Sequence, residues 1–252
     1  MKKLLDIRFY HFILRVLPRV LPKYIWDWVS PILFTAYLRY AEILRPLFFK
    51  MPSERFIEYS WAIKNFQESD KRILDVGCGD SLFDCKLARL GHEVCAIDLE
   101  NSIVAQKSNY HFLQADIVNV PFKDQSFDKI HALSTIEHID EGKTGLSDDQ
   151  ITAMKNMCRI LKNGGDLILT MPLGDYDGAC NLYRFEKLLE AAKDEGLRCD
   201  AQDYYIAQGR RWRIISGKGA IGYVKPLLNT EKIIVCLGFT KKSDSFKEGV
   251  NP

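Results

Sequence analysis

The chain has 252 residues, of which 47% are hydrophobic and 27% charged, and this globular composition excludes disordered and fibrous proteins. The formal net charge of +2 argues against a protein coated with positive charge for binding nucleic acid. The charge is unevenly placed, because residues 1–50 carry nine Lys and Arg against three acids, a net +6, and the rest of the chain carries −4. We therefore expect a basic arm on a mildly acidic body.

Residues 1–60 are predicted to form a basic, aromatic, helical N-terminal appendage. Basic side chains recur every three or four residues on one face of the first helix candidate, at Arg8, His11, Arg15 and Arg19. Prolines are expected to cut residues 1–50 into short helices, at Pro18, Pro22, Pro31 and Pro46. The appendage is expected to be a lid packed on the body, with a membrane-interface arm and a partner-binding segment as alternatives. The longest uncharged run, 28–38, is too short to span a bilayer.

The seven cysteines are odd in number, scattered and without a C-x-x-C pair, which disfavours both a disulfide framework and a zinc site. This pattern favours a reducing compartment. We expect a cytoplasmic protein, with peripheral contact to the inner face of a membrane as an open alternative.

From residue 72 onward, short apolar runs alternate with helical patterns. The expected strands are 72–77, 93–98, 111–116, 128–133, 166–171, 198–206 and 233–239. The expected helices are 81–90, 147–161 and 181–195, the second beginning with a capping box of Ser147 and Gln150. Such alternation predicts an α/β fold with a parallel sheet.

The segment I-L-D-V-G-C-G-D-S, residues 73–81, combines a strand, a glycine turn and a helix start. Glycines let the backbone approach a ligand closely, and a helix start presents N–H groups. Asp98 follows Gly79 by 19 residues and ends the next strand, where nucleotide-binding folds place an acid for ribose hydroxyls. Leu82 stands where a dinucleotide fingerprint needs its third glycine, so NAD is disfavoured.

Five successive motifs resemble those of class I S-adenosylmethionine-dependent methyltransferases. They are D-V-G-C-G (75–79), Asp98, Q-A-D (114–116), V-P-F-K-D-Q-S-F-D-K-I (120–130) and L-K-N-G-G (161–165). The resemblance covers residues 72–174. It implies a Rossmann-like, doubly wound, mostly parallel seven-stranded sheet in a domain over 61–242, closed by the antiparallel strand 233–239. The polar composition of residues 243–252 separately predicts a flexible tail. Asn163, where the family often has proline, should affect a turn and not the chemistry.

The resemblance also implies a binding site for S-adenosyl-L-methionine. Its predicted residues are Asp75, Gly77, Cys78, Gly79, Asp98, Leu99, Asp116, Ile117 and Ser134. In this assignment the glycine turn lines the methionine and ribose, and Asp75 holds the amino group. Asp98 takes the ribose diol, while Asp116 and Ile117 flank the adenine.

The loop S-T-I-E-H-I, residues 134–139, carries the catalytic candidates His138 and Glu137. An unperturbed histidine titrates near neutral pH and can accept a proton from a hydroxyl. Hydrogen bonding of His138 to a neighbouring loop or to the cofactor is the alternative. No metal site is expected.

The same loop lacks the Asp/Asn-Pro-Pro-Tyr/Phe motif of nucleobase amino-group methylases. The sequence therefore predicts methyl transfer to a small-molecule or lipid-like acceptor, on oxygen or carbon, with nucleic acid disfavoured as a partner. Candidate acceptor-pocket residues are 175–177, Tyr183 and Phe185. The alternatives are an RNA methyltransferase that uses the basic arm and residues 209–213, and a non-catalytic nucleoside-binding scaffold.

Overall fold

The computed structural model describes residues 16–43, 54–66, 71–107, 110–139, 147–175, 178–209 and 211–242. The predicted basic helix face at residues 8–15, Pro46 and the predicted tail at 243–252 lie outside these residues. The chain divides into two compact units. The N-terminal unit comprises Met1–Ala115 with Gly209–Arg211, and the C-terminal unit comprises Asp116–Gln208 with Trp212–Pro252. The described part of the predicted appendage belongs to the N-terminal unit, while the proposed division at residue 60 stays a prediction.

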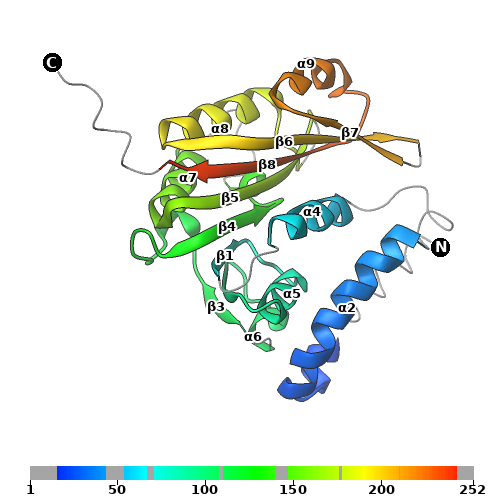
Figure 1. Ribbon diagram of the computed structural model, residues 1–252, viewed down its shortest axis with the longest axis vertical. Coiled ribbons are helices and arrows are strands. Elements are labelled where there is room, and N and C mark those ends of the chain that lie inside the picture. Colours follow the sequence, from blue (N-terminus) through cyan, green and yellow to red (C-terminus); the bar gives the residue numbers. More distant parts are fainter. Residues whose placement is uncertain are drawn as a thin grey trace. The chain divides into compact units, whose positions relative to one another are not determined.

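The N-terminal unit contains three parallel strands in the order β3-β2-β1. The strands are β1 (Arg72–Val76), β2 (Glu93–Asp98) and β3 (His111–Gln114). The helices are residues 16–20, α2 (Lys23–Ile43), α4 (Glu54–Ala62), η1 (Ile63–Asn65), α5 (Phe83–Arg89) and α6 (Ile103–Lys107). The long helix α2 runs alongside α5 (Figure 1).

An aromatic cluster joins α2, α4 and α5. The rings of Tyr59 and Phe83 stack with centroids 5.3 Å apart, and Phe34 meets both edge-on. All three side chains are buried. Aromatic pairs in these geometries stabilise by about 0.5–1.5 kcal/mol beyond their buried area, so the cluster fastens α2 to the unit.

Helix α2 continues through Pro31, so the predicted break at this proline is wrong. Proline cannot donate an N–H to the carbonyl one turn earlier, which usually kinks or ends a helix. Here Trp26 precedes the proline and Phe34 follows it, and both side chains are fully buried. Packing on each side of Pro31 outweighs the missing hydrogen bond.

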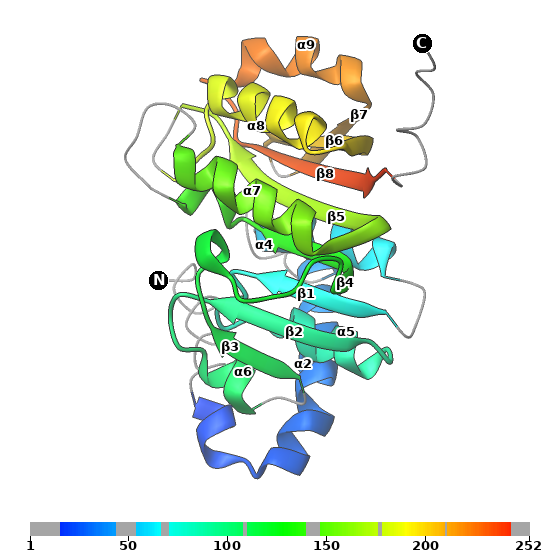
Figure 2. The ribbon, with the colours of Figure 1, turned by 90° about the vertical axis from the view of Figure 1, so that its left-hand side faces the viewer.

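The C-terminal unit contains five strands in the order β4-β5-β8-β6-β7. They are β4 (Phe127–Leu133), β5 (Leu161–Leu173), β6 (Leu197–Gln208), β7 (Arg211–Ser216) and β8 (Ile233–Lys241). The helices are η2 (Ile117–Asn119), η3 (Ile136–His138), α7 (Asp148–Ile160), α8 (Leu182–Asp194), η4 (Lys218–Ala220), α9 (Ile221–Val224) and η5 (Lys225–Leu227). Helices α7 and α8 lie side by side on one face of these strands (Figure 2).

The described strands confirm the α/β class but number eight, where seven are predicted. The additional strand is β7, from the region that lacks any resemblance. Strand β8 is antiparallel, as predicted, but it lies between β5 and β6 and pairs with both. Its burial on both sides explains its uninterrupted apolar sequence.

The L-K-N-G-G segment is the irregular start of β5 and not the end of a helix. Gly164 has φ +75°, a left-handed conformation that favours glycine. A Cβ on Gly165 would lie 2.8 Å from the Asp128 carbonyl oxygen. The two glycines therefore allow the chain to leave α7 and enter the sheet beside β4.

Candidate functional site

The glycine turn after β1 is fastened to the end of β2. Gly77 and Cys78 donate their N–H groups to the Ile97 carbonyl oxygen, at 2.8 and 3.2 Å. Gly79 donates its N–H to Asp98 Oδ2 at 2.8 Å. Gly77 and Gly79 have φ values of +77° and +49°, so the turn requires the conformational freedom of glycine.

Asp98 is held by two backbone amides. Its second oxygen, Oδ1, accepts the N–H of Glu100 at 2.9 Å. A carboxylate oxygen has two lone pairs, so each oxygen of Asp98 can still accept a hydroxyl proton. A Cβ on Gly79 would meet no atom within 4 Å, so the space above the turn is open. This pairing of a fixed carboxylate with an open glycine turn fits a ribose diol.

The other predicted cofactor residues of the N-terminal unit differ in accessibility. Asp75 on β1 and Cys78 are both 4% exposed. The Cys78 side chain packs against Ala96 and Ala105, so it is the backbone of Cys78 that belongs to the surface of the turn. Burial, and secondly the charge of Asp75, raise the pKa of the Cys78 thiol. Leu99 is 66% exposed.

Helix α5 begins at Phe83, two residues later than predicted. The Ser81 hydroxyl oxygen accepts the Phe83 N–H at 3.0 Å and lies 3.0 Å from the Tyr59 hydroxyl. This bonding holds Ser81 in a turn ahead of the helix. The helix therefore opens close to the glycine turn, as predicted, and presentation of its first N–H groups to a ligand stays a prediction.

Ser102 also holds this loop through hydrogen bonds that the sequence does not predict. Ser102 donates its hydroxyl to Asp80 Oδ1 at 3.0 Å and accepts the Ala105 N–H at 3.0 Å. Ser102 precedes α6 as a capping residue, a signal that the sequence does contain. Its contact with Asp80 joins residues 22 positions apart, and no local pattern encodes that.

In the C-terminal unit, Asp116 caps the short helix η2. Its Oδ1 accepts the Val118 N–H at 2.9 Å. Asn156 of α7 donates to the carbonyl oxygens of Ile117 and Val118, both at 2.9 Å. The Ile117 side chain is buried. The two predicted adenine-flanking residues thus sit in a turn that α7 holds in place.

Ser134, at the end of β4, has φ +47°, which is strained for a residue with a side chain. Its N–H donates to the Thr170 carbonyl oxygen at 2.9 Å and lies 3.2 Å from the Thr170 hydroxyl oxygen. Such strain persists where surrounding contacts impose it, and it clusters at functional sites. Thr170 is a supporting residue that the sequence analysis missed.

The catalytic candidates Glu137 and His138 lie in η3, directly after this strained residue. The Glu137 side chain is 1% exposed and the His138 side chain is 50% exposed, with 4.0 Å between His138 Nε2 and Glu137 Oε1. Arg184 of α8 donates to the Glu137 carbonyl oxygen at 3.3 Å, and Gln150 of α7 donates to the Ile136 carbonyl oxygen at 2.8 Å. Two helices therefore hold the loop, and of the two candidates His138 is accessible.

The predicted acceptor-pocket residues do not share one environment. Phe185 is fully buried against Tyr204, with ring centroids 6.3 Å apart, so it is a core residue, the alternative that the sequence leaves open. Tyr183 is 59% exposed and Asp175 is exposed. Residues 176, 177 and 210 lie outside the described residues.

Comparison with known proteins identifies the family. Residues 74–169 match the family described as a methyltransferase domain. Residues 74–169 are therefore a methyltransferase domain, in agreement with the predicted resemblance to the class I S-adenosylmethionine-dependent methyltransferases. S-adenosyl-L-methionine is the cofactor, as predicted, and the mixed α/β fold with a largely parallel sheet is the Rossmann-like fold of this family.

Two curated relatives have different names. A ubiquinone biosynthesis O-methyltransferase of Xanthomonas oryzae is 33% identical over 110 residues, which cover 39% of this chain and 42% of the relative. The "Probable tRNA methyltransferase 9B" of Bos taurus is 30% identical over 106 residues, which cover 41% of this chain and 22% of the relative. The chain thus spans less than half the length of these relatives.

A solved SAM-dependent methyltransferase from Methanosarcina mazei superposes with a TM-score of 0.52 at 16% identity. The match covers 73% of this chain and 98% of that chain. At this identity the likeness concerns the fold alone, and fold does not determine the substrate.

Proposed function

We propose that this chain transfers a methyl group from S-adenosyl-L-methionine to a small-molecule or lipid-like acceptor, on oxygen or carbon. The observation that carries the proposal is the open glycine turn beside Asp98, whose two oxygens each accept one backbone N–H. Bound S-adenosylmethionine supplies an activated methyl group. The protein then has to align the acceptor and exclude water, and such positioning can supply about 7–11 kcal/mol.

We assign the role of general base to His138 for an acceptor that enters protonated. Its half-exposed ring can be reached from solvent, whereas the Glu137 carboxylate is buried beside it. A buried carboxylate 4.0 Å from the imidazole can fix the orientation of the ring. In this assignment Glu137 is a positioning residue.

A lipid-like acceptor is supported by the relative named as a ubiquinone biosynthesis O-methyltransferase. The residues after β4 read Ser134-Thr135-Ile136-Glu137 and lack the proline pair of nucleobase amino-group methylases. RNA is the second candidate acceptor, because another relative is named as a tRNA methyltransferase. RNA binding would weaken steeply as salt rises, since cations on the protein release counterions from phosphates.

Cofactor binding by the full chain is the first test, measured by isothermal titration with S-adenosylmethionine. Asp98→Ala should weaken binding by at least about tenfold, because one charged hydrogen bond contributes about 1.5–3 kcal/mol. Asp194→Ala, at the exposed end of α8, should leave affinity unchanged. Equal affinities for both variants would contradict the assignment of Asp98.

A matched glycine pair separates backbone strain from ligand contact. Gly79 and Gly196 have φ values of +49° and +82°, and a Cβ at either would meet no protein atom within 4 Å. Alanine at each should cost about 1 kcal/mol of stability. We expect Gly79→Ala in addition to weaken cofactor binding, because its Cβ enters the open space beside Asp98, while Gly196→Ala binds normally.

The acceptor class is tested with labelled S-adenosylmethionine and separate lipid, small-molecule and RNA fractions. Label in the lipid or small-molecule fraction supports the proposal, and label in RNA favours the second candidate. If the protein binds the cofactor but labels no fraction, the non-catalytic scaffold predicted as an alternative is favoured.

A further inference from the structure

Large apolar side chains form an exposed ridge along α2 and the turn before it. The ridge consists of Val20, Tyr24, Trp28 and Ile32, which are 64%, 74%, 61% and 45% exposed. Within α2 the spacing of four residues places Tyr24, Trp28 and Ile32 on one helical face. Contiguous apolar surface of this kind marks an interaction surface more often than scattered exposed residues do.

The opposite face of α2 is buried inside the N-terminal unit. Trp26 and Phe34 are fully buried and Ser30 is 1% exposed. Helix α2 lies along α5 of the same unit (Figure 1). The ridge therefore cannot turn inward without exposing an equally apolar face.

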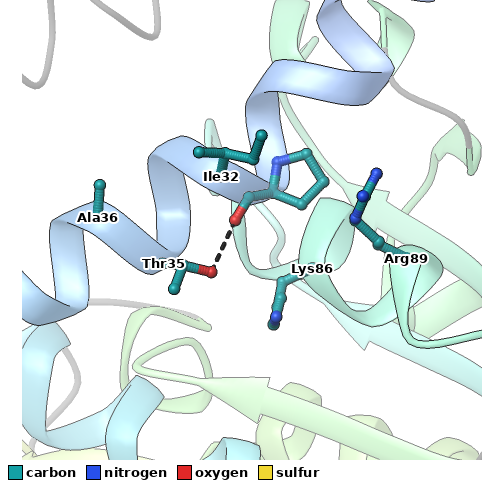
Figure 3. Close-up of a pocket in the computed structure, with 6 residues that line it drawn as sticks. Ile32, Thr35, Ala36, Lys86 and Arg89 are labelled. Atoms are coloured by element: carbon teal, nitrogen blue, oxygen red, sulfur yellow. Dashed lines mark hydrogen bonds between the residues drawn. The ribbon is translucent and has the colours of Figure 1, made fainter.

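A basic pocket adjoins the ridge. It has a volume of about 350 Å³ and is lined by Pro31, Ile32, Thr35 and Ala36 of α2 and by Lys86 and Arg89 of α5. Figure 3 shows the two basic side chains on α5, across the pocket from Ile32. Among the described residues, no carboxylate forms an ion pair with Lys86 or Arg89. Two cations that form no ion pair with a described carboxylate thus lie beside exposed apolar surface.

Further charges around the ridge have the same sign. Arg19 and Lys23 are exposed near its beginning. Asp27, the acid of the described segment 16–37, lies toward α5 in a small pocket with Ser30 and Arg89. Burial raises the pKa of Asp27, and Lys23 partly opposes this. The outward surface therefore combines aromatic and aliphatic side chains with cations.

We propose that the ridge and the pocket together form a docking surface for an anionic lipid bilayer, with Lys86 and Arg89 receiving a lipid phosphate. Tyr and Trp favour the membrane interface because their rings are apolar and their polar ends stay hydrated. Basic side chains near an anionic membrane each contribute about 1 kcal/mol. No described helix is long and apolar enough to cross a membrane, so α2 would lie in the interface. This inference does not depend on the proposed methyl transfer.

The test uses the full chain in co-sedimentation with two kinds of vesicle. One kind contains phosphatidylcholine alone and the other contains phosphatidylcholine with phosphatidylglycerol. We expect binding to the anionic vesicles, weakening as salt rises, and little binding to the neutral ones. Equal binding to both, or no binding to either, would overturn the proposal.

Charge reversal tests the pocket. Lys86→Glu with Arg89→Glu should weaken binding to anionic vesicles by about 30-fold or more, from about 1 kcal/mol for each lost cation. Lys123→Glu with Lys155→Glu produces the same change in net charge at exposed positions elsewhere and should bind nearly normally. If both double variants lose affinity equally, net charge explains the binding and the assignment of the pocket fails.

Two substitutions test the ridge. Tyr24 and Tyr223 are both 74% exposed, so Tyr24→Ser and Tyr223→Ser form a matched pair. Tyr24→Ser should weaken binding about fivefold, given partial burial of one aromatic side chain, and Tyr223→Ser should not weaken it. Similar affinity for both variants would contradict insertion of the ridge.

The fluorescence of Trp28 can report its contact with lipid directly. Trp26 and Trp61 are buried and Trp212 on β7 is partly buried, whereas Trp28 is 61% exposed. Brominated lipids should quench tryptophan emission in the wild type, and Trp28→Phe should remove most of the quenching while retaining binding. Sedimentation without quenching would show that another surface contacts the vesicle and would overturn the proposal. If the ridge binds a protein partner and not lipid, neither kind of vesicle should sediment the chain.

Discussion

Residues with positive φ occur in both predicted binding segments. The sequence predicts this conformation at the glycines but not at Ser134. Gly77 and Gly79 were found because glycine itself indicates a backbone that other residues avoid. Ser134 adopts φ +47° because Thr170, on a different strand, binds its N–H. Its strain comes from a contact 36 residues away, so its conformation could not be predicted locally. Individual residues therefore predict the cofactor-binding turn, whereas the contacts that support the site come from distant parts of the chain and could not be predicted.

His138 gives the residue-scale prediction. Once an acceptor is found, His138→Ala should lower kcat by about 10²–10⁴, the usual contribution of a positioned general base. Affinity for S-adenosylmethionine should change little. His111→Ala, at an exposed position on β3, is the control. A normal kcat in His138→Ala would favour the alternative in which this histidine only bonds a neighbouring loop.

Elements encoded by neighbouring residues were predicted well. The capping box of α7 is present as expected, with the Ser147 hydroxyl accepting the Gln150 N–H and the Gln150 side chain accepting the Ser147 N–H. Elements whose form depends on packing against distant residues were not predicted well. The insertion of β8 between β5 and β6 depends on pairing, and the continuity of α2 through Pro31 depends on burial. Periodicity alone contains neither kind of information.

Gln150 gives the element-scale prediction, because it joins two elements. Its Oε1 accepts the Ser147 N–H in the capping box of α7, and its Nε2 donates to the Ile136 carbonyl oxygen in the loop that carries His138. Gln150→Glu can keep the capping box but loses the donor and places a carboxylate against a carbonyl oxygen. We expect a loss of about 1–3 kcal/mol in the free energy of unfolding and faster hydrogen exchange at His138 and Ile139.

Ser147→Ala is the matched control for Gln150→Glu. It removes the cap, at a cost of about 1 kcal/mol, and leaves the bond from Gln150 to the Ile136 carbonyl in place. Its loop amides should therefore exchange as in the wild type. Equal exchange in both variants would mean that Gln150 does not hold the loop.

At the scale of the whole molecule, the chain combines a predictable framework with additions that the family resemblance does not cover. The α/β class followed from alternating strands and helices, and the cofactor followed from five motifs in order. The region after β6 contains β7 and α9, which the sequence does not predict because these short segments show no clear strand or helix periodicity. The uneven charge of the chain is consistent with the basic surroundings of the α2 ridge, although much of the basic N-terminal segment lies outside the described residues.

Buried tyrosines make the stability of the molecule sensitive to alkali. Burial raises the pKa of Tyr59 from 10.0 to about 12, and the nearby Arg55 partly opposes this. A raised pKa in the folded state means that the folded protein retains the phenol proton longer than the unfolded chain. The resulting stability is fully present below the unfolded pKa of 10.0 and is lost as the pH rises toward about 12.

We therefore expect the free energy of unfolding to fall as the pH rises from 10 to 12, by up to about 1.4 kcal/mol per pH unit from Tyr59. Urea titrations at successive pH values measure this slope. Tyr59→Phe should flatten the slope, although it costs about 1 kcal/mol at neutral pH by removing the hydrogen bond to Ser81. Tyr223→Phe, at an exposed position, should leave the slope unchanged. An unaltered slope in Tyr59→Phe would show that other groups, such as Tyr204 and Tyr205, account for the sensitivity to alkali, because burial raises their pKa values to about 12 as well.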